Sequence, residues 1–178
     1  MGRLYAAALI LAILATSSPK AQAPNRLLPA DLAGLEGTWV LDVARSGLTP
    51  GDAEQRVIKT GPTWLRLDIQ RASSASPIAL IYNLDGSQNI NAFGAETAVT
   101  RLNRQGEQVV LETVFTVNSQ AVTVHELLPL VPTGFELTVE VALRVEHGYQ
   151  GVAVPGPSRG TQSPPNVSNG TKVFRKQI

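Results

Sequence analysis

The segment 135–146 alternates between apolar and polar residues with Ala142 as the one exception, and no other feature constrains the fold as strongly. One set of its residues is apolar throughout and shares a face: Phe135, Leu137, Val139, Val141, Leu143 and Val145. The opposite face carries Glu136, Thr138, Glu140, Ala142, Arg144 and Glu146. A period of two over this length predicts a β-strand with one buried and one solvated face.

Shorter strands are expected through the rest of the chain. We predict them at 38–43, 55–60, 63–70, 78–83, 88–92, 97–103, 108–117, 121–130 and 171–176, with a short helical turn at 29–36 before them. Turn residues such as Asp85-Gly86 separate neighbouring strands, which predicts sequential hairpins and an antiparallel sheet. A sheet of about nine or ten strands closes on itself or folds over, because free edges invite aggregation. The sequence therefore predicts an all-β fold, either an up-and-down barrel or a β-sandwich.

Residues 1–23 have the layout of a secretory signal peptide. Arg3 supplies a positive charge, residues 4–15 are apolar, and small and polar residues follow. The apolar run is too short to span a bilayer as a helix. Cleavage after Ala23 fits the small-x-small rule but places Pro24 after the bond, so cleavage after Ser17 is the alternative. We expect a periplasmic or secreted protein, with no stable membrane span once the leader is removed.

The mature chain, 24–178, is expected to form a single domain. Its 155 residues are enough for one hydrophobic core. The leader carries two basic residues and no acidic one, which leaves 13 basic and 14 acidic residues and argues against a nucleic-acid partner. The chain has no cysteine, which excludes disulfides and thiolate metal sites. The segment 148–170 is rich in Gly, Pro and Ser and is predicted to be a flexible loop.

Three short motifs occur in order along the mature chain. The run 35–42 contains Gly37-Thr38-Trp39 and is followed by Ser46, a Tyr-x-x-Asp-Gly motif occupies 82–86, and the chain ends on an aromatic-x-Lys strand at 174–176. In these motifs, and in the strand pattern between them, the chain resembles lipocalins and the wider calycin superfamily. The resemblance is strongest to small exported bacterial lipocalin-like proteins of uncharacterised function.

The resemblance implies a barrel whose open end holds a small apolar ligand. It also implies that Trp39, with Gly37, closes the barrel floor and that a basic residue of the last strand lies over the indole ring. Arg175 or Lys172 is the candidate for this cation–π contact, worth about 0.5–2 kcal/mol. The loop at 148–170 is longer than in these proteins, which leaves open how tightly the barrel closes beside the last strand.

Glu126 is the sharpest candidate for a functional residue. If Pro132-Thr133 form a two-residue turn, Glu126 lies opposite Val139 and Val124 opposite Val141. Extending this register to the preceding hairpin places Phe115 opposite Val124 and Thr113 opposite Glu126. A carboxylate facing the barrel interior is costly unless it is paired or solvated. We therefore predict a polar anchor in a ligand cavity whose candidate lining is Thr113, Phe115, Val124, Glu126, Val139 and Val141. The alternative is a bulge or strand end that leaves Glu126 near solvent.

No other pattern in the sequence indicates chemistry. His125 is expected to face outward opposite Glu140, and His147 to be solvated at a strand end, so the two histidines do not converge on a metal ion. No metal site and no cofactor is predicted. The chain has no nucleophile-elbow motif, no phosphate-binding loop and no paired catalytic carboxylates, so no catalytic residue is named and enzymatic activity stays uncertain.

Three hypotheses for function remain. The favoured one is an exported non-catalytic protein that binds a small, apolar molecule in a barrel cavity. The second is an envelope protein–protein interaction module with a filled barrel, which meets its partner through the 148–170 loop or an outer strand face. The third is a hydrolase or isomerase that uses Glu126. An internal cavity favours the first, an exposed apolar patch over a filled interior the second, and a second titratable group beside Glu126 the third.

Overall fold

The computed structural model describes residues 26–146, 149–150, 161–162 and 164–178. The expected signal peptide and most of the expected loop at 148–170 lie outside these residues. The described chain begins with a short helix, α1 (Pro29–Leu32), and a 3-10 turn, η1 (Ala33–Leu35), within the predicted helical segment. A second 3-10 turn, η2 (Pro50–Asp52), lies in the first long loop. Among the described residues, no helix is long and apolar enough to cross a membrane.

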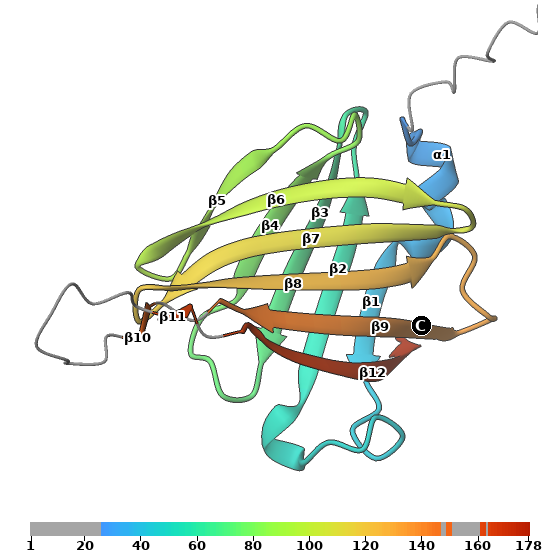
Figure 1. Cartoon of the computed structure of the whole chain (residues 1–178). Helices are drawn as coiled ribbons and strands as arrows, with labels where there is room; N and C mark the ends of the chain where they lie inside the picture. The colour runs from blue at the N-terminus through green and yellow to red at the C-terminus, as the bar shows by residue number, and fades with distance from the viewer. Residues whose placement is uncertain (1–25, 147–148, 151–160, 163) are drawn as a thin grey trace, which may run out of the picture.

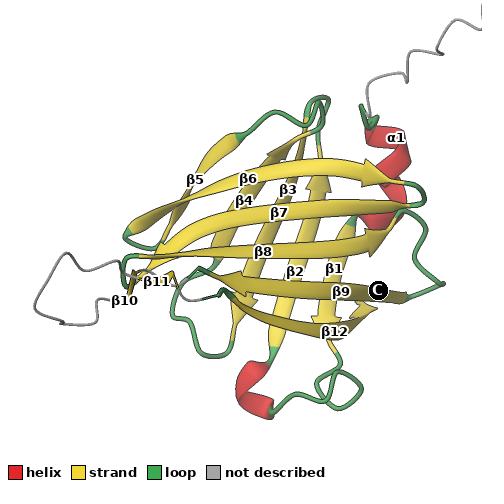
Figure 2. Cartoon of the chain, viewed as in Figure 1, coloured by secondary structure: helices red, strands yellow, loops and turns green. Residues whose placement is uncertain are grey.

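Ten strands form one antiparallel sheet, shown in Figures 1 and 2. They are β1 (Gly37–Leu41), β2 (Glu54–Thr60), β3 (Trp64–Arg71), β4 (Ile78–Asn83), β5 (Asn89–Phe93), β6 (Glu96–Gln105), β7 (Gln108–Val117), β8 (Gln120–Pro129), β9 (Glu136–Val145) and β12 (Asn166–Lys176). Their order in the sheet is β4-β3-β2-β1-β12-β9-β8-β7-β6-β5. Two further strands, β10 (Tyr149–Gln150) and β11 (Thr161–Gln162), form a separate two-stranded antiparallel sheet.

The sheet curls into a nearly closed up-and-down barrel, which confirms the predicted fold class. The pairing of β12 with both β1 and β9 joins the two halves of the chain into one continuous sheet. The β-sandwich alternative is wrong, because that architecture needs two separate facing sheets.

Side chains bridge the seam between β4 and β5, the two ends of the sheet. The Asn91 side chain accepts a hydrogen bond from the Ile81 amide at 2.8 Å and donates one to the Ile81 carbonyl at 3.2 Å. The Thr100 hydroxyl and the Asn89 side-chain amide also donate to that carbonyl. Asn91 and Thr100 are buried. Side-chain groups therefore satisfy backbone atoms that a neighbouring strand would otherwise satisfy.

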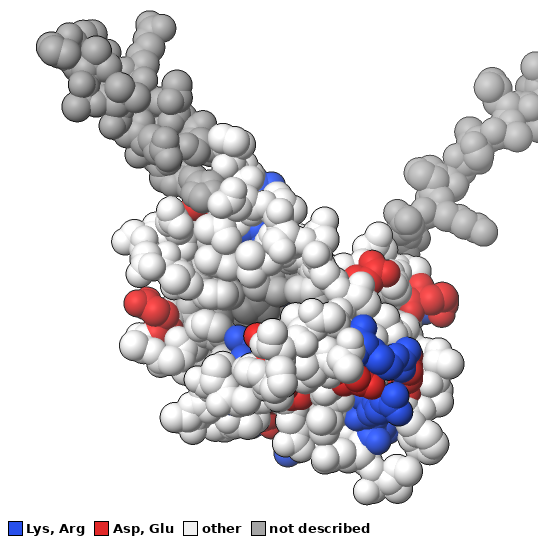
Figure 3. Space-filling model, turned by 90° about the horizontal axis from the view of Figure 1, so that it is seen from below, with Lys and Arg blue, Asp and Glu red and all other residues white. Residues whose placement is uncertain are grey.

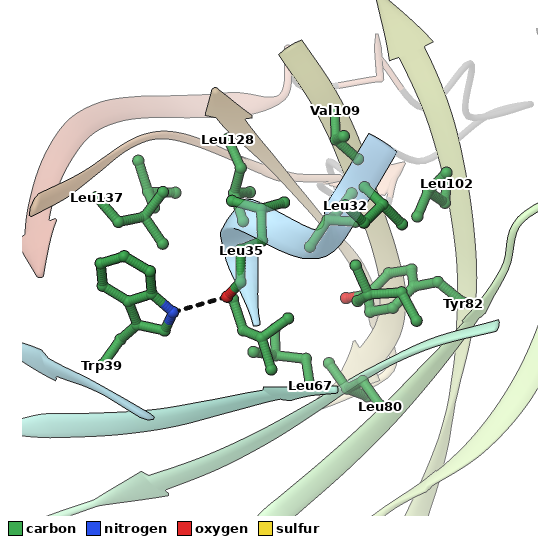
Figure 4. Close-up of a cluster of buried hydrophobic side chains, with 14 of the residues drawn as sticks. Leu32, Leu35, Trp39, Leu67, Leu80, Tyr82, Leu102, Val109, Leu128 and Leu137 are labelled. Atoms are coloured by element: carbon green, nitrogen blue, oxygen red, sulfur yellow. Dashed lines mark hydrogen bonds between the residues drawn. The ribbon is translucent and has the colours of Figure 1, made fainter. Parts of the chain in front are cut away.

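One end of the barrel, which we term the closed end, is filled by apolar residues from the N-terminal segment. Leu32 of α1 and Leu35 of η1 point into the barrel among buried side chains from the strands (Figure 4). The indole Nε1 of Trp39 donates a hydrogen bond to the Leu35 carbonyl oxygen at 2.8 Å. This bond satisfies the buried indole and fixes η1 across the barrel floor.

The basic residue over Trp39 is Lys176, so the expectation of Arg175 or Lys172 is wrong. Lys176 Nζ lies 5.1 Å from the indole centroid. Side chains alternate along β12, so Arg175 faces outward, where it pairs with Asp42 at 2.9 Å. Lys172 shares the inward face with Lys176 but lies further from the barrel floor. Gly37 makes room for Lys176, because a Cβ there would lie 2.7 Å from Lys176 Cε and Gly37 has φ of +126°.

The β8–β9 hairpin is shifted by two residues from the predicted register. Glu126 lies opposite Val141, and Val124 opposite Leu143. The connection is longer than two residues, with a bridge between Thr133 and Glu136, and β9 begins only at Glu136. Phe135, expected on the buried face of this strand, consequently lies in the turn and is 64% exposed.

The β7–β8 hairpin is shifted by two residues as well. Asn118 and Ser119 both have positive φ and form a tight two-residue turn, so Thr113 lies opposite Val124 and Phe115 opposite Val122. The predicted Thr113–Glu126 and Phe115–Val124 pairs are therefore wrong. Because the side-chain period is two, a shift of two residues keeps each side chain on its predicted face.

The last strand is longer than predicted. β12 begins at Asn166 rather than 171, and the segment 166–170 pairs with β9 from Val145 to Val141. The final residues of the expected flexible loop are thus part of the sheet. The segment 166–170 is polar, but its backbone groups pair with those of β9, and this pairing explains why it forms a strand.

Candidate functional site: a cavity at the open end of the barrel

The barrel contains a cavity of about 290 Å³ at the end opposite α1, which we term the open end. This volume is close to the lower limit of the usual range for small-molecule pockets, roughly 300–1,000 Å³. Its lining comes from seven strands and consists of Ile69, Arg71, Ile78, Leu80, Phe93, Thr113, Phe115, Val124, Glu126, Val141, Leu143 and Lys172. Figure 3, seen from below, shows a hollow in this face with basic and acidic atoms at its edge.

Five of the six predicted lining residues face this cavity. They are Thr113, Phe115, Val124, Glu126 and Val141. The sixth, Val139, is fully buried in the hydrophobic core and does not line the cavity. Two aromatic rings in contact with each other form part of the wall, since the centroids of Phe93 and Phe115 lie 4.5 Å apart.

Glu126 faces inward, as predicted, and is paired with a buried arginine. Arg56 of β2 reaches across the barrel and donates two hydrogen bonds to the Glu126 carboxylate, at 2.6 and 3.3 Å. Arg56 is only 1% exposed and Glu126 8%. The two-point geometry is the strongest form of arginine–carboxylate pairing, and it offsets the cost of burying both charges. The alternative of a solvated Glu126 at a strand end is wrong.

Arg56 also contacts a second carboxylate and an aromatic ring. Its Nε donates to Glu54 Oε1 at 2.5 Å, and its guanidinium carbon lies 4.6 Å from the Phe174 centroid. Burial alone would lower the pKa of Arg56, but the charges of Glu126 and Glu54 outweigh burial and raise the pKa. Arg56 is therefore a permanent cation held between two carboxylates and an aromatic face.

Glu54 forms ion pairs with cations from three strands. Besides Arg56, it accepts hydrogen bonds from Lys172 Nζ at 2.9 Å and from Arg71 Nε at 3.2 Å, both on Oε2. Burial alone would raise the pKa of Glu54, but the charges of Arg56 and Lys172 lower the pKa to about 2. The ionised carboxylate thus ties β2 to β3 and β12 at the open end.

A pair of hydroxyl groups lies near Glu126. Tyr82 OH and Thr113 Oγ1 share a hydrogen bond of 2.8 Å, and Thr113 lines the cavity. Burial and the charge of Glu126 raise the pKa of Tyr82, so its hydroxyl stays protonated across the physiological range. A single shared bond uses one of the two hydroxyl protons, which leaves the other to donate elsewhere.

The other sequence candidates lie away from the cavity. His125 points outward as predicted, but its neighbour is Glu112 at 3.0 Å rather than Glu140. Within the described parts of the chain, no group of three or more histidine, aspartate or glutamate residues is arranged to hold a metal ion. His147 lies outside the described residues.

Sequence reasoning missed Glu54, Arg56, Arg71 and Tyr82. A signal for the first two was present, since Glu54, Arg56 and Ile58 alternate on one strand and must share a face. Opposite charges on the buried face of a strand indicate an internal ion pair. Arg71 likewise follows Leu67 and Ile69 at intervals of two. Nothing in the sequence indicated that Arg56 would meet Glu126, which is 70 residues away along the chain.

Comparison of the chain with protein-family profiles and with curated proteins finds no match. The chemistry of the site therefore rests on its own geometry. The cavity offers apolar walls, one buried carboxylate balanced by Arg56, a hydroxyl, and two cations at its edge. In proteins generally, small-molecule pockets combine apolar walls with a few polar groups that fix the orientation of the ligand, and this cavity has both features.

Proposed function

We propose that this protein is an exported, lipocalin-like carrier that binds a small, largely apolar molecule in its barrel cavity. The observation that carries the proposal is the cavity of about 290 Å³ at the open end, opposite a closed end packed with leucine side chains and Trp39. A barrel packed along its whole length would leave no such space. Export and lipocalin kinship rest on the leader-like residues 1–23 and on the three sequence motifs.

The geometry around Glu126 favours binding over catalysis. Both oxygens of Glu126 accept hydrogen bonds from Arg56, a group that does not release its proton. The raised pKa of Tyr82 keeps that neighbour neutral. General acid–base chemistry works best with groups that titrate near the operating pH, and neither of these two neighbours of Glu126 does so.

The proposal is tested with the uncharged fluorescent probe N-phenyl-1-naphthylamine, titrated into the mature protein. We expect saturable binding of one equivalent. Replacing Val124 with tryptophan fills the cavity and should abolish binding. The matched control is Thr123→Trp, the adjacent residue of β8, whose side chain faces outward because neighbours on a strand alternate.

Equal binding by wild type and Val124→Trp would contradict the proposal, as would the absence of binding to wild type. Native mass spectrometry of protein isolated from its producing cells then identifies the natural ligand class. A retained small molecule that is absent from the Val124→Trp protein would support a carrier. Binding of the probe at the exposed Val131 and Phe135 instead would favour an interaction module.

A further inference from the structure

Among the residues that line the cavity, two cations, Arg71 and Lys172, outnumber the one carboxylate, Glu126. Arg71 and Lys172 both line the cavity, and both hydrogen-bond the same atom, Glu54 Oε2. The other oxygen of Glu54 accepts from Arg56. One carboxylate is thus shared among three cations.

The remaining nearby carboxylates have other partners. Glu126 is matched by two hydrogen bonds from Arg56. Asp52 accepts hydrogen bonds from the Thr49 amide and hydroxyl, and its charge also acts on Lys172, but Asp52 does not line the cavity. Glu54 and Asp52 thus act on these cations from outside the cavity lining. The carboxylate within the lining is Glu126, and Glu126 is already paired with Arg56.

Arg71 and Lys172 are also more accessible than the rest of the network. Their side chains are 44% and 22% exposed, whereas Glu54 and Arg56 are almost fully buried. Arg71 donates to Glu54 through Nε, and no described residue accepts from its terminal nitrogens, which can therefore serve a second acceptor. A lysine ammonium likewise carries three donors, and Lys172 uses one of them on Glu54.

The walls beyond these two cations are mainly apolar, with Thr113 and Glu126 as the polar exceptions. Ile69, Leu80, Phe115 and Val141 lie on different strands and face the same space. A molecule that fills the cavity would thus have its polar group next to Arg71 and Lys172 and its apolar part against these walls. An amphiphile has the same arrangement, with a polar group at one end and an apolar chain at the other. The cavity therefore favours a ligand of this class, and in one orientation.

We propose that the ligand is an anionic amphiphile, whose carboxylate or similar monoanionic group binds between Arg71 and Lys172 while its apolar chain enters the barrel. This inference rests on the proposed carrier function. Its chemistry is that of charge-assisted hydrogen bonds from two cations to one anion at a partly desolvated site.

The test is a calorimetric titration of the mature protein with four probes of equal chain length, namely decanoate, decyl sulfate, decanol and decylamine. Each ionic probe is kept below its critical micelle concentration, and decanol is kept below its solubility limit. Decanoate should bind at least about tenfold more tightly than decanol, a difference that corresponds to about 1.4 kcal/mol. Decyl sulfate distinguishes a site for any monoanion from one that prefers a carboxylate. Tighter binding of decanol or decylamine than of both anions would overturn the inference.

The double variant Arg71→Gln/Lys172→Gln should lose this preference and bind decanoate and decanol within about twofold of each other. The matched control is Arg66→Gln/Arg175→Gln. Arg66 lies on β3 with Arg71 and is 43% exposed, and Arg175 lies on β12 with Lys172, but both face outward and pair with aspartates. The control should keep the wild-type preference for decanoate.

The outcomes separate this inference from the carrier proposal. If wild type binds none of the four probes, the carrier proposal fails. If it binds all of them equally and Arg71→Gln/Lys172→Gln behaves as wild type, the carrier proposal stands and the anionic headgroup site does not exist. Circular dichroism and a melting curve check that the double variant folds, and the single variant Lys172→Gln gives the same comparison with a smaller perturbation of Glu54.

Discussion

Replacing Arg56 with methionine is expected to destabilise the protein strongly, because Arg56 contacts two buried carboxylates at once. The variant leaves Glu126 without the two hydrogen bonds it accepts from Arg56 and removes one of three cations from Glu54. Breaking a buried ion pair by removing one partner costs roughly 3–5 kcal/mol. Loss of the contact with Phe174 adds to this. We expect a loss of about 4 kcal/mol and a fall in melting temperature of about 10 °C.

The assay is equilibrium unfolding in urea followed by the fluorescence of Trp39 and Trp64. The slope of unfolding free energy against urea should stay as in wild type, while the midpoint falls by about 2 M. Arg66→Met is the control, because it also removes an arginine that pairs with a carboxylate, but at an exposed site. Exposed pairs contribute roughly 0–1 kcal/mol, so this variant should stay close to wild type.

A second variant tests whether the cost arises from the stranded carboxylate. In Arg56→Met/Glu126→Met both partners become apolar, while Glu54 keeps Lys172 and Arg71. The double variant should be more stable than Arg56→Met alone, with a coupling of about 2 kcal/mol or more between the two positions. A loss below about 1 kcal/mol for Arg56→Met, or additive losses in the double variant, would refute the stabilising role given to the ion pair.

Three more variants test other parts of the structure. Glu54 has a folded pKa of about 2 against about 4.5 when unfolded, so the unfolded state binds more protons between these values and stability should fall by about 3 kcal/mol as pH decreases from about 4.5 to 2. Glu54→Gln should be less stable than wild type at pH 7 and should lack this component of the acid-induced loss in urea titrations at each pH; an unchanged acid profile would contradict the assignment. Gly37→Ala should lower stability by about 2 kcal/mol or more in thermal melts, because the residue has φ of +126° and the added Cβ would meet Lys176. The additional change Lys176→Ala removes the contact but not the backbone strain, so it should restore only part of the lost stability. Full restoration would exclude backbone strain as a cause. Asn91→Ala should speed hydrogen exchange at the Ile81 amide relative to amides in β7, because the Asn91 side chain accepts that bond, and unchanged protection would mean that the seam is held by other contacts.

The predicted fold followed from side-chain periodicity, and the positions that were wrong depended on turn geometry. The strand 136–145 could be predicted because a period of two over its length is incompatible with the 3.6-residue period of a helix. The register of its hairpin was wrong because the connection from Pro129 to Glu136 is longer than two residues. The face on which each side chain lies was still predicted correctly, because a shift of two residues leaves the alternation intact. Glu126 therefore points inward, as predicted.

The candidate site was predicted in part for the same reason. Thr113, Phe115, Val124 and Val141 line the cavity because each lies on the inward face of its strand. Strand periodicity could not predict the partner of Glu126, because Arg56 lies on a strand across the barrel rather than on a neighbouring one. Local patterns determine which face a residue occupies, whereas contacts across a barrel depend on its closure and on the lengths of long side chains.

Lys176 illustrates the same limit at the closed end. The resemblance implied a basic residue over Trp39, and the last strand offers three, at 172, 175 and 176. The pairing of Trp39 with Lys176 in adjacent strands selects among them, since directly opposed residues share a face. This pairing depends on where β12 ends relative to β1, which the sequence pattern alone does not specify.

Nuclear magnetic resonance mapping of decanoate binding tests the central claim, that the open-end cavity is the binding site, most directly. Decanoate is titrated into the ¹⁵N-labelled mature protein, and amide shifts are followed residue by residue. We predict saturable shifts centred on Thr113, Val124 and Val141, which line the cavity, with little change around the exposed Val131. Shifts confined to the outer surface, or none at millimolar decanoate, would contradict the claim.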